Sequence, residues 1–411
     1  MHLFINISSL VTNEGLVSKN KFSKIDTLDL GILSNAWLAV KEGMVEDYGQ
    51  GPIPKSYLKY AVTDLGQSLV LPGLVDSHAH PVFAGSRANE FTARLAGESY
   101  QQIAARGGGI ASTIKATRAA TRDELCHKTR ENLKSIQAHG VTTIECKTGY
   151  GQSPQTELLQ LEILTELQAE LPLNIVRTYL GLHAKPQEIA STEEFVQLMT
   201  TPLKQIAQKN LADFVDAFVE EGYFNVPTCE NYFNEAKESG LGIRIHADEF
   251  ADAGAAAAAA RWRAASADHL EECSEEGALA MATAGTIATL LPGTSLYTKI
   301  PYANASLFQK AGVPVAIATD FNPGSCRFHS LPFCCALGAL NCGLTPAEAI
   351  AAVTWIPAKS LNLSDKCGAL SRGYPADFLV HKAGDISHWL ADFGQTLPEQ
   401  IYRHGELNVL N

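Results

Sequence analysis

The chain has 411 residues, with 32 lysines and arginines against 44 aspartates and glutamates, which gives a formal net charge of −12. Its hydrophobic fraction of 46% is that of a folded globular protein, so the composition excludes a disordered chain. The acidic excess, without blocks of Lys or Arg, argues against a nucleic-acid or anionic-membrane partner, because both require clustered positive charge. A small anionic substrate is not excluded, since one well-placed arginine can hold it.

Nine cysteines are spread between Cys126 and Cys367 and include no Cys-x-x-Cys pair. A secreted disulfide framework or a zinc module would need regular pairing, so we interpret them as small buried side chains in a reducing compartment. No basic segment followed by an apolar run opens the chain, and the longest uncharged stretch, 277–298, is interrupted by Pro292. These features predict a cytoplasmic protein.

Short apolar runs rich in β-branched residues alternate with segments long enough for a helix along most of the chain. We predict strands at 69–80, 142–147, 175–183, 214–220, 242–248, 266–271, 286–293 and 314–320. Helical patterns lie between them at 155–169, 188–209, 229–239 and 303–311. Eight such strands favour an α/β fold of the (β/α)8 TIM-barrel type over a doubly wound sheet, which usually has fewer strands.

The two ends of the chain have a different pattern, with short strand-like pieces separated by Gly, Asn and Pro. Residues 1–67 contain such pieces at 3–7, 36–41 and 44–48, and residues 366–411 contain them at 377–381 and 406–410. We expect the two ends to pair into one small β-sandwich domain. Residues 68–365 are then left for the catalytic barrel.

The strongest chemical signal is Asp76-Ser77-His78-Ala79-His80, at the end of the first predicted barrel strand. Alternation along a strand places His78 and His80 on the same face, so both imidazoles can reach one ion. A single His-x-His pair is a weak signal, and buried or surface histidines are the simpler interpretation of it. Its position strengthens it, because barrel active sites lie at the carboxyl ends of the strands.

Three further residues occupy equivalent strand ends: His246, His269 and Asp320. Imidazoles with one carboxylate suit Zn2+ or Fe2+. If one of these residues does not bind the ion, a coordination position is left for water. Because such residues end four of the eight predicted strands, the pattern indicates a metal site.

The motifs resemble the amidohydrolase superfamily of metal-dependent barrels and, within it, the imidazolonepropionase family of histidine degradation. The matching stretches are VDSHAHPVFAGSR (75–87), GGGI (107–110), ECKTGYG (145–151), TYLGLHA (178–184), HADEF (246–250), SADHLEE (266–272) and ATDFNPGS (318–325). The His-x-His pair is generic to the superfamily. The combination of FAGSR, KTGYG, HADEF and DFNPGS is much more specific.

The resemblance implies that one Zn2+ or Fe3+ per subunit is bound by His78, His80, His246 and Asp320. It places His269 beside the metal as a catalytic, charge-stabilising group. Binuclear relatives use a carbamylated lysine at the end of the fourth strand, but here that strand ends in Phe218-Val219-Glu220. Lys147 and Lys185 follow the second and third strands and would not substitute, so we expect a single metal.

The resemblance also implies a substrate with a carboxylate, held by Arg87 in a two-pronged pair. Without the resemblance, Arg87 would be interpreted as a solvated loop residue. Further substrate-binding residues implied in the same way are Tyr150, His183, Glu249, Asn322, Gly324 and Ser325. The glycine-containing turn after Asp320 can aim backbone N–H groups at an anion. Gly107–Gly109 form either a loop over the site or a plain connector.

The implied reaction is hydrolysis of 4-imidazolone-5-propanoate to N-formimidoyl-L-glutamate. A bound metal lowers the pKa of its water from about 15.7 to roughly 7. Either Glu249 or Asp320 would transfer the proton, and His269 would stabilise the oxyanion. The partners expected are this small molecule and, from the family, a second copy in a homodimer, with no nucleic acid or membrane.

Two alternatives stay open from the sequence. One is another mononuclear amidohydrolase acting on a cytosine- or guanine-type ring, which has no carboxylate for Arg87. The other is a non-enzymatic barrel relative, although such relatives typically lose metal ligands and all four remain here. One stretch departs from the family pattern: Cys326-Arg327-Phe328-His329 brings bulky and charged groups close to the substrate loop.

Overall fold

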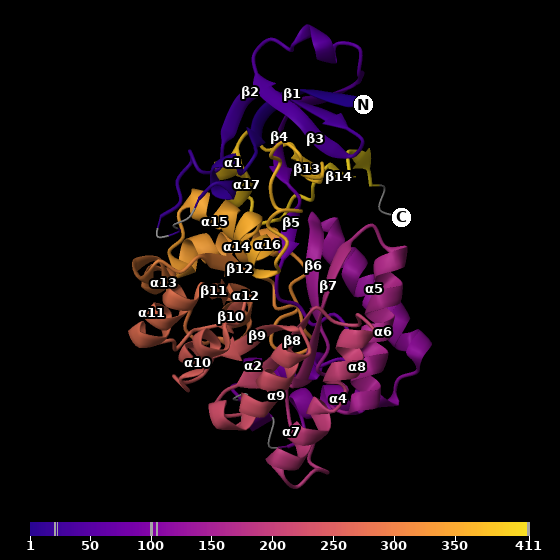
Figure 1. The fold of residues 1–411 in the computed structure, drawn as a ribbon, viewed down its shortest axis with the longest axis vertical. Coiled ribbons are helices and arrows are strands. Elements are labelled where there is room, and N and C mark those ends of the chain that lie inside the picture. Colours follow the sequence, from indigo (N-terminus) through magenta and orange to yellow (C-terminus); the bar gives the residue numbers. More distant parts are fainter. Residues whose placement is uncertain (20–21, 23, 99–101, 104–105, 409–411) are drawn as a thin grey trace.

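The computed structural model describes residues 1–411 except 20–21, 23, 99–101, 104–105 and 409–411. Two sheets organise the described chain: an eight-stranded parallel sheet, and a seven-stranded sheet built from both ends of the sequence (Figure 1). The predicted barrel with an additional β domain is therefore confirmed.

The barrel strands follow one another in chain order, and every neighbouring pair is parallel. They are β5 (Leu74–Asp76), β6 (Val141–Lys147), β7 (Asn174–Leu182), β8 (Phe214–Val219), β9 (Gly242–Ala247), β10 (Ser266–His269), β11 (Ile287–Leu290) and β12 (Val315–Ile317). The first and last strands meet just beyond their ends, through a parallel bridge between Ala79 and Phe321. There the amide of Asp320 donates to the carbonyl of His78 (2.9 Å), which closes the barrel.

Helices surround the strands. They are α2 (Ala88–Leu95), α4 (Ile110–Ala119), α5 (Arg122–Ala138), α6 (Pro154–Glu170), α7 (Thr192–Thr200), α8 (Leu203–Gln208), α9 (Val226–Glu238), α10 (Ala255–Trp262), α11 (Glu275–Ala284), α12 (Pro292–Thr298), α13 (Ala305–Ala311), α14 (Leu331–Leu337), η2 (Gly338–Cys342), α15 (Pro346–Ala352) and α16 (Trp355–Ser360). The single helix predicted at 188–209 is two helices, because Pro202 lacks the N–H that a continuous helix would need.

The first predicted strand, 69–80, belongs to two different sheets. Its first part is the end of β4 (Ala61–Pro72) in the terminal sheet, and β5 starts after Gly73. A Cβ atom at Gly73 would lie 2.2 Å from Oγ1 of Thr142, so glycine lets the chain pass closely from one sheet to the other. The apolar run continues through this change of sheet and does not reveal it.

The terminal sheet has the strand order β15-β14-β13-β4-β1-β2-β3. Besides β4 it contains β1 (His2–Val11), β2 (Ile32–Lys41), β3 (Met44–Gln50), β13 (Phe378–His381), β14 (Gln400–Arg403) and β15 (Glu406–Leu407), with the short helices α1 (Glu14–Val17), η1 (Lys55–Tyr57) and α17 (Ile386–Ala391) beside it. The ring of Phe4 in β1 lies 5.0 Å from that of Tyr402 in β14. Three strand positions in a flat sheet would separate them by about 14 Å, so the sheet curls and encloses an apolar core. Of the predicted end strand 406–410, residues 409–410 lie outside the described chain.

The terminal sheet packs at the amino ends of the barrel strands. Arg403 of β14 donates to the carbonyls of Thr142 (3.0 Å), at the start of β6, and Pro172 (2.8 Å), before β7. The carboxyl ends of the strands therefore lie on the opposite side, away from the N-terminus and β1 (Figure 1). In the described residues no helix has the length and apolarity to cross a bilayer.

Candidate active site

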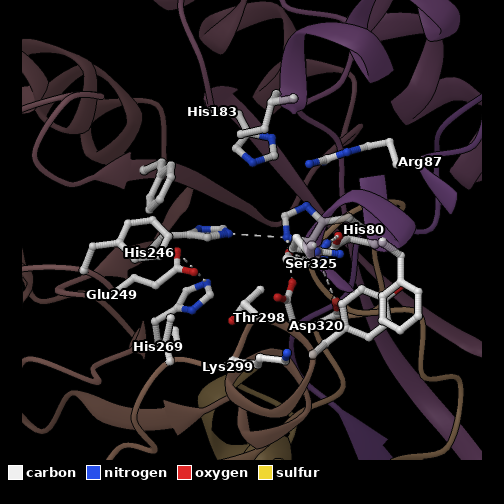
Figure 2. Close-up of a pocket in the computed structure, with 18 of the residues that line it drawn as sticks. His80, Arg87, His183, His246, Glu249, His269, Thr298, Lys299, Asp320 and Ser325 are labelled. Carbon is white, nitrogen blue, oxygen red and sulfur yellow. Dashed lines mark hydrogen bonds and ion pairs between the residues drawn. The ribbon is translucent and has the colours of Figure 1, made fainter. Parts of the chain in front are cut away.

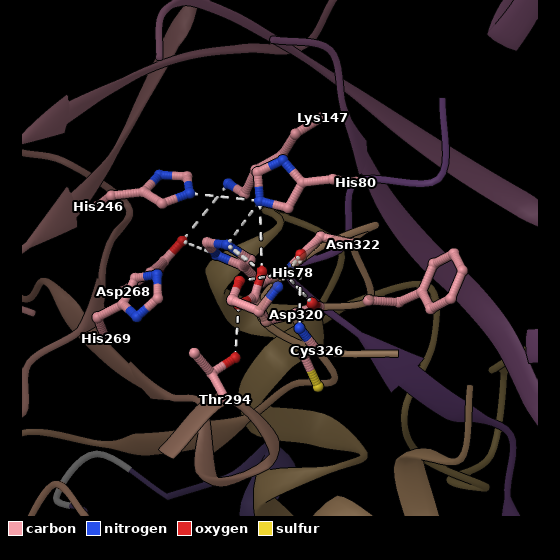
Figure 3. A network of polar contacts seen from close by, with 12 residues as sticks. His78, His80, Lys147, His246, Asp268, His269, Thr294, Asp320, Asn322 and Cys326 are labelled. Carbon is pink, nitrogen blue, oxygen red and sulfur yellow. Dashed lines mark hydrogen bonds and ion pairs between the residues drawn. The ribbon is translucent and has the colours of Figure 1, made fainter. Parts of the chain in front are cut away.

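The predicted metal ligands converge at the carboxyl ends of the barrel strands. His78 and His80 follow β5, His246 belongs to β9, and Asp320 follows β12. All four side chains are buried. Figure 3 shows these side chains gathered together.

Several of their donor atoms are spaced as ligands of one ion would be. Nε2 of His80 lies 3.2 Å from Nε2 of His78, 3.4 Å from Nε2 of His246 and 3.4 Å from Oδ1 of Asp320. Oδ1 of Asp320 lies 3.6 Å from Nε2 of His78. Ligands 2.0–2.1 Å from a common ion at tetrahedral angles are about 3.3 Å apart. The three imidazole nitrogens lie within 4.8 Å of one another and could hold a metal ion, and Oδ1 of Asp320 adjoins two of them.

A second layer of carboxylates orients two of these imidazoles. Oδ2 of Asp268 lies 2.8 Å from Nδ1 of His78, and Oδ2 of Asp216 lies 3.0 Å from Nδ1 of His246. Lys147 joins both carboxylates, with Nζ 2.7 Å from Asp216. Figure 3 shows its contact with Asp268, at 3.5 Å. Such partners turn each ligand ring so that its other nitrogen faces the ion.

This second layer is fully buried and its charges are paired. Nζ of Lys147 is 2.8 Å from Glu145, which also lies 3.0 Å from Nε of Arg244 and accepts the hydroxyl proton of Thr178 (2.5 Å). Burial alone would lower the pKa of Lys147, but the carboxylates of Asp216, Glu145 and Asp268 outweigh it and raise that pKa. The ammonium therefore stays charged. Lys147 is thus no bridging metal ligand here; its charge is taken up by these carboxylates.

Asp320 is held from two sides. Oδ2 accepts the hydroxyl proton of Thr294 (2.6 Å), while Oδ1 faces the histidine nitrogens. Burial by itself would raise the pKa of Asp320, but the hydrogen bond from His80 and the neighbouring histidines outweigh it and lower that pKa. The side chain is therefore an ionised carboxylate.

His269 and Glu249 lie beside the ligand set. Nε2 of His269 is 3.8 Å from Oε2 of Glu249, and both residues line the same cavity (Figure 2). Burial lowers the pKa of His269 to about 3. Burial, together with the nearby Glu271, Asp320 and Glu220, raises the pKa of Glu249 well above its ordinary value.

The cavity has a volume of about 520 Å3 and opens beside the metal ligands. Of the predicted substrate-binding residues it is lined by Arg87, Tyr150, His183, Glu249, Asn322 and Ser325. The His183 ring stacks on that of His80 (5.4 Å), and its Nδ1 lies 3.0 Å from the carbonyl of Gly149. Tyr150 packs 5.2 Å from His183. These rings form a wall next to the ligand set.

Arg87 directs its guanidinium into this cavity (Figure 2). Its Nε donates to Oε2 of Glu90 (2.8 Å), and Oε1 of Glu90 accepts the backbone N–H of Gly109 (2.9 Å). Both side chains are buried. The Gly107–Gly109 segment, which leads into α4, is thus tied to Arg87 through Glu90.

The turn after Asp320 differs from the expectation that its N–H groups face an anion. The amides of Gly324 (2.8 Å) and Ser325 (2.7 Å) donate to Oδ1 of Asn322, inside the turn. Gly324 does not line the cavity but lies against the guanidinium of Arg87. A polar side chain two residues before a glycine satisfies the turn by itself.

A profile of the amidohydrolase family matches residues 69–401. An imidazolonepropionase from Fusobacterium nucleatum is 37% identical over 405 residues, which cover 98% of this chain and 97% of that protein. One from Bacillus cereus is 38% identical over 410 residues, covering 98% and 96%. The chain belongs to the amidohydrolase family, among the imidazolonepropionases.

Solved structures of more distant amidohydrolases share the fold. A 5-methylcytosine deaminase from Klebsiella pneumoniae superposes with a TM-score of 0.75 at 15% identity, covering 99% of this chain and 97% of that one. An atrazine chlorohydrolase from Arthrobacter aurescens, complexed with zinc, gives 0.68 at 14% identity, covering 99% and 95%. This amidohydrolase is a metal-dependent hydrolase of a small molecule.

The departing stretch 326–329 of this amidohydrolase turns away from the cavity. The Cys326 thiol donates to the carbonyl of Thr319 (3.1 Å). Arg327 lies over the ring of Phe321 (4.9 Å), and the His329 ring packs on the same phenyl group (4.2 Å). Arg327 and His329 therefore cover the buried Phe321 and do not obstruct the Asn322–Ser325 turn.

Sequence reasoning missed the second layer and part of the cavity wall of this amidohydrolase. The missed residues are Glu90, Asp216, Arg244, Asp268, Glu271 and Thr294 in the second layer, and Phe91, Arg94, Phe218, Tyr297 and Lys299 in the wall. A signal was present for two of them. Asp216 interrupts an otherwise apolar strand and Asp268 lies in a fully buried one, where an unpaired carboxylate would be costly.

Proposed function

We propose that this chain hydrolyses the cyclic amide of 4-imidazolone-5-propanoate to give N-formimidoyl-L-glutamate. The observation that carries the proposal is that one cavity is lined both by His80, His246 and Asp320 of the predicted ligand set and by Arg87. The substrate has a ring amide, which must lie beside the metal ligands, and a carboxylate, which must reach the arginine. Both groups of the protein are therefore needed in the same cavity. The imidazolonepropionase relatives support this choice of substrate.

The four ligands would hold one Zn2+ or Fe3+ per subunit. When bound, such an ion polarises the ring carbonyl and lowers the pKa of a water molecule so that it can attack at neutral pH. Asp268 and Asp216 would keep His78 and His246 turned toward it.

In the reaction the oxygen of water joins the carbonyl carbon, the ring C–N bond breaks, and the departing nitrogen takes a proton. We assign the proton transfer to Glu249. The side chains of Glu249 and Asp320 both line the cavity, but both oxygens of Asp320 are engaged, one by the histidines and one by Thr294, whereas the contact of Glu249 with Nε2 of His269 is a longer 3.8 Å. The carboxyl group of Glu249 can therefore take the proton from water and deliver it to nitrogen.

His269 is neutral at pH 7, since its pKa lies at about 3 because of burial, so its Nε2–H can donate to the oxygen that becomes negative during attack. We propose that Tyr150 and His183 flank the ring. Arg87 would hold the propionate with the Asn322–Ser325 turn, in which Gly324 makes room for the guanidinium. Much of the rate would come from this positioning.

The alternative of a cytosine- or guanine-type aminohydrolase is supported only by the shared fold of the deaminases. A ring without a carboxylate would form no ion pair with the Arg87 guanidinium at the cavity wall, which disfavours this alternative.

The deciding experiment is a turnover assay with 4-imidazolone-5-propanoate on protein whose metal content has been measured. We expect consumption of the substrate with about one Zn2+ or iron ion per chain. Arg87→Ala should raise KM at least about tenfold, since a charge-assisted bond is worth about 1.5–3 kcal/mol. Arg122→Ala, on an outer helix, is the matched control. Metal-loaded wild-type protein that leaves the substrate intact would refute the assignment.

The family also predicts a homodimer in the cytoplasm. Light scattering coupled to gel filtration would then give twice the 44.2 kDa of one chain.

A further inference from the structure

The ring of His269 lies between two buried carboxyl groups, of which the proposed reaction uses only one. Oε2 of Glu249 is 3.8 Å from Nε2, and Oε2 of Glu271 is 3.8 Å from Nδ1. Glu249 lines the cavity, whereas Glu271 does not. The Glu271 side chain is only 1% exposed, so its position behind the ring is not that of a solvated acid.

Nδ1 of His269 and Oε2 of Glu271 are both buried without a hydrogen-bond partner among the described residues. Two such atoms facing each other are each costly to leave unpaired. Their separation exceeds a normal hydrogen bond by about 1 Å, and catalytic hydrogen bonds are often this long before substrate binds. A small movement of the carboxyl group satisfies both atoms at once.

The rest of Glu271 is anchored in the orientation that this contact needs. Its Oε1 accepts the hydroxyl proton of Ser295 (3.1 Å), which leaves Oε2 on the side of His269. The backbone between the two residues is unusual, because His269 and Leu270 have φ angles of +81° and +71°. Consecutive left-handed residues other than glycine persist only where the surrounding structure holds them, often at functional sites.

That backbone is held by hydrogen bonds to the neighbouring strand end. The amide of Leu270 donates to the carbonyl of Ala247 (3.0 Å), and that of Glu272 donates to Asp248 (2.9 Å). His269 and Glu271 are thereby fixed beside the end of β9, which also carries His246.

We propose that Glu271 is a positioning residue, whose carboxyl group hydrogen-bonds Nδ1 of His269 and so fixes the ring with Nε2 facing the cavity. The proposal rests on the role of His269 in the proposed hydrolysis. Glu271 acts only through His269 and does not touch the substrate.

The proton arrangement follows from the environment of both groups. Burial raises the pKa of Glu271 to about 8, so at pH 7 its carboxyl group is mostly protonated and donates to Nδ1. A neutral ring that accepts at Nδ1 carries its own proton on Nε2. This tautomer presents an N–H donor to the substrate oxygen.

The first test compares Glu271→Leu with Glu271→Gln under saturating and limiting substrate. Leucine cannot bond Nδ1, so we expect kcat to fall about 10- to 100-fold, as when other ring-orienting partners are removed, with KM and metal content unchanged. The glutamine amide can donate to Nδ1 and should keep kcat within about threefold of wild type. Glu272→Leu, at the exposed neighbouring position, is the matched control and should behave as wild type.

The second test does not depend on turnover. In Zn2+-loaded protein labelled with 15N-histidine, the ring signals of His269 are identified by their loss in His269→Asn. We expect the Nε2–H tautomer in wild type and in Glu271→Gln, and a changed tautomer population in Glu271→Leu. If Glu271→Leu does not fold, Ser295→Ala, which removes the anchor of Glu271, is measured instead.

Identical His269 signals in wild type and Glu271→Leu would overturn the proposal, as would a kcat of Glu271→Leu within twofold of wild type. A fall in metal content or a change in KM alone would overturn it too, because either result would show a structural role. Inactive wild-type protein would contradict only the proposed function, and the NMR comparison would still decide the role of Glu271.

Discussion

The guanidinium of Arg87 occupies space that a side chain at position 324 would fill. A Cβ atom on Gly324 would lie 1.9 Å from Nη1 of Arg87 and 2.0 Å from its Cζ. Gly324→Ala should therefore displace Arg87 and raise KM for the carboxylated substrate about tenfold or more, with a smaller change in kcat. Steady-state kinetics measure both constants. Gly384→Ala, where a Cβ meets nothing closer than 4.0 Å, should leave KM unchanged; an unchanged KM in Gly324→Ala would contradict the role of Arg87.

Lys147 connects the carboxylates that orient His78 and His246. Lys147→Met would leave Asp216, Glu145 and Asp268 without their shared ammonium, in a fully buried place. We expect the dissociation constant for the metal to rise about 10- to 100-fold and the free energy of unfolding to fall by about 3–5 kcal/mol. Chelator competition and denaturant titration measure these quantities. Lys115→Met, on the exposed side of α4, controls for the loss of one lysine; equal metal affinity in both variants would refute the connection.

At the scale of strands, the convergence of the predicted ligands could be foreseen because strand geometry is local. Alternation puts His78 and His80 on one face, and the barrel brings strand ends together whatever their distance in sequence. The partners of Lys147 could not be predicted in this way, since they come from β6, β8 and β10 and their choice depends on how barrel interior side chains interdigitate. The change of sheet at Gly73 was hidden for a similar reason: only its contact with Thr142 distinguishes it from a strand interior.

The contact between β13 and α17 predicts a pH dependence of stability. Nε1–H of Trp389 donates to Nε2 of His381 (3.2 Å), and burial lowers the pKa of this imidazole from 6.5 to about 4, although Asp392 and Glu399 oppose the change. The unfolded chain binds the proton more readily than the folded one. Stability from neutral His381 is therefore fully present above pH 6.5 and is lost as the pH falls toward 4, by at most about 3 kcal/mol.

His381→Gln keeps an acceptor for Trp389 but cannot titrate in this range. Denaturant unfolding of both proteins at pH 7 and pH 5 should show a smaller loss of stability in the variant. Parallel losses in the two proteins would show that other groups account for the acid sensitivity.

For the whole molecule, the ligand set spans the place where the barrel closes. His78 and His80 follow the first strand and Asp320 follows the last, while the backbone between them is joined by the Asp320 amide and the bridge of Ala79 to Phe321. Metal binding should therefore stabilise the closed barrel, by about 2.7 kcal/mol when free metal exceeds its dissociation constant 100-fold. Calorimetry should show Tm rising with metal concentration. Asp320→Ala should largely remove this dependence, and an unchanged Tm in wild-type protein would contradict it.

The junction of the first and last barrel strands also bears on when the chain can bind a metal. His78 and Asp320 are 320 − 78 = 242 residues apart in sequence, and the strand that carries Asp320 is the last of the barrel. During synthesis, the early histidines leave the ribosome long before their carboxylate partner exists. With this ligand set, tight metal binding would occur only late in synthesis, and chains that end before β12 would bind the metal more weakly than the full chain.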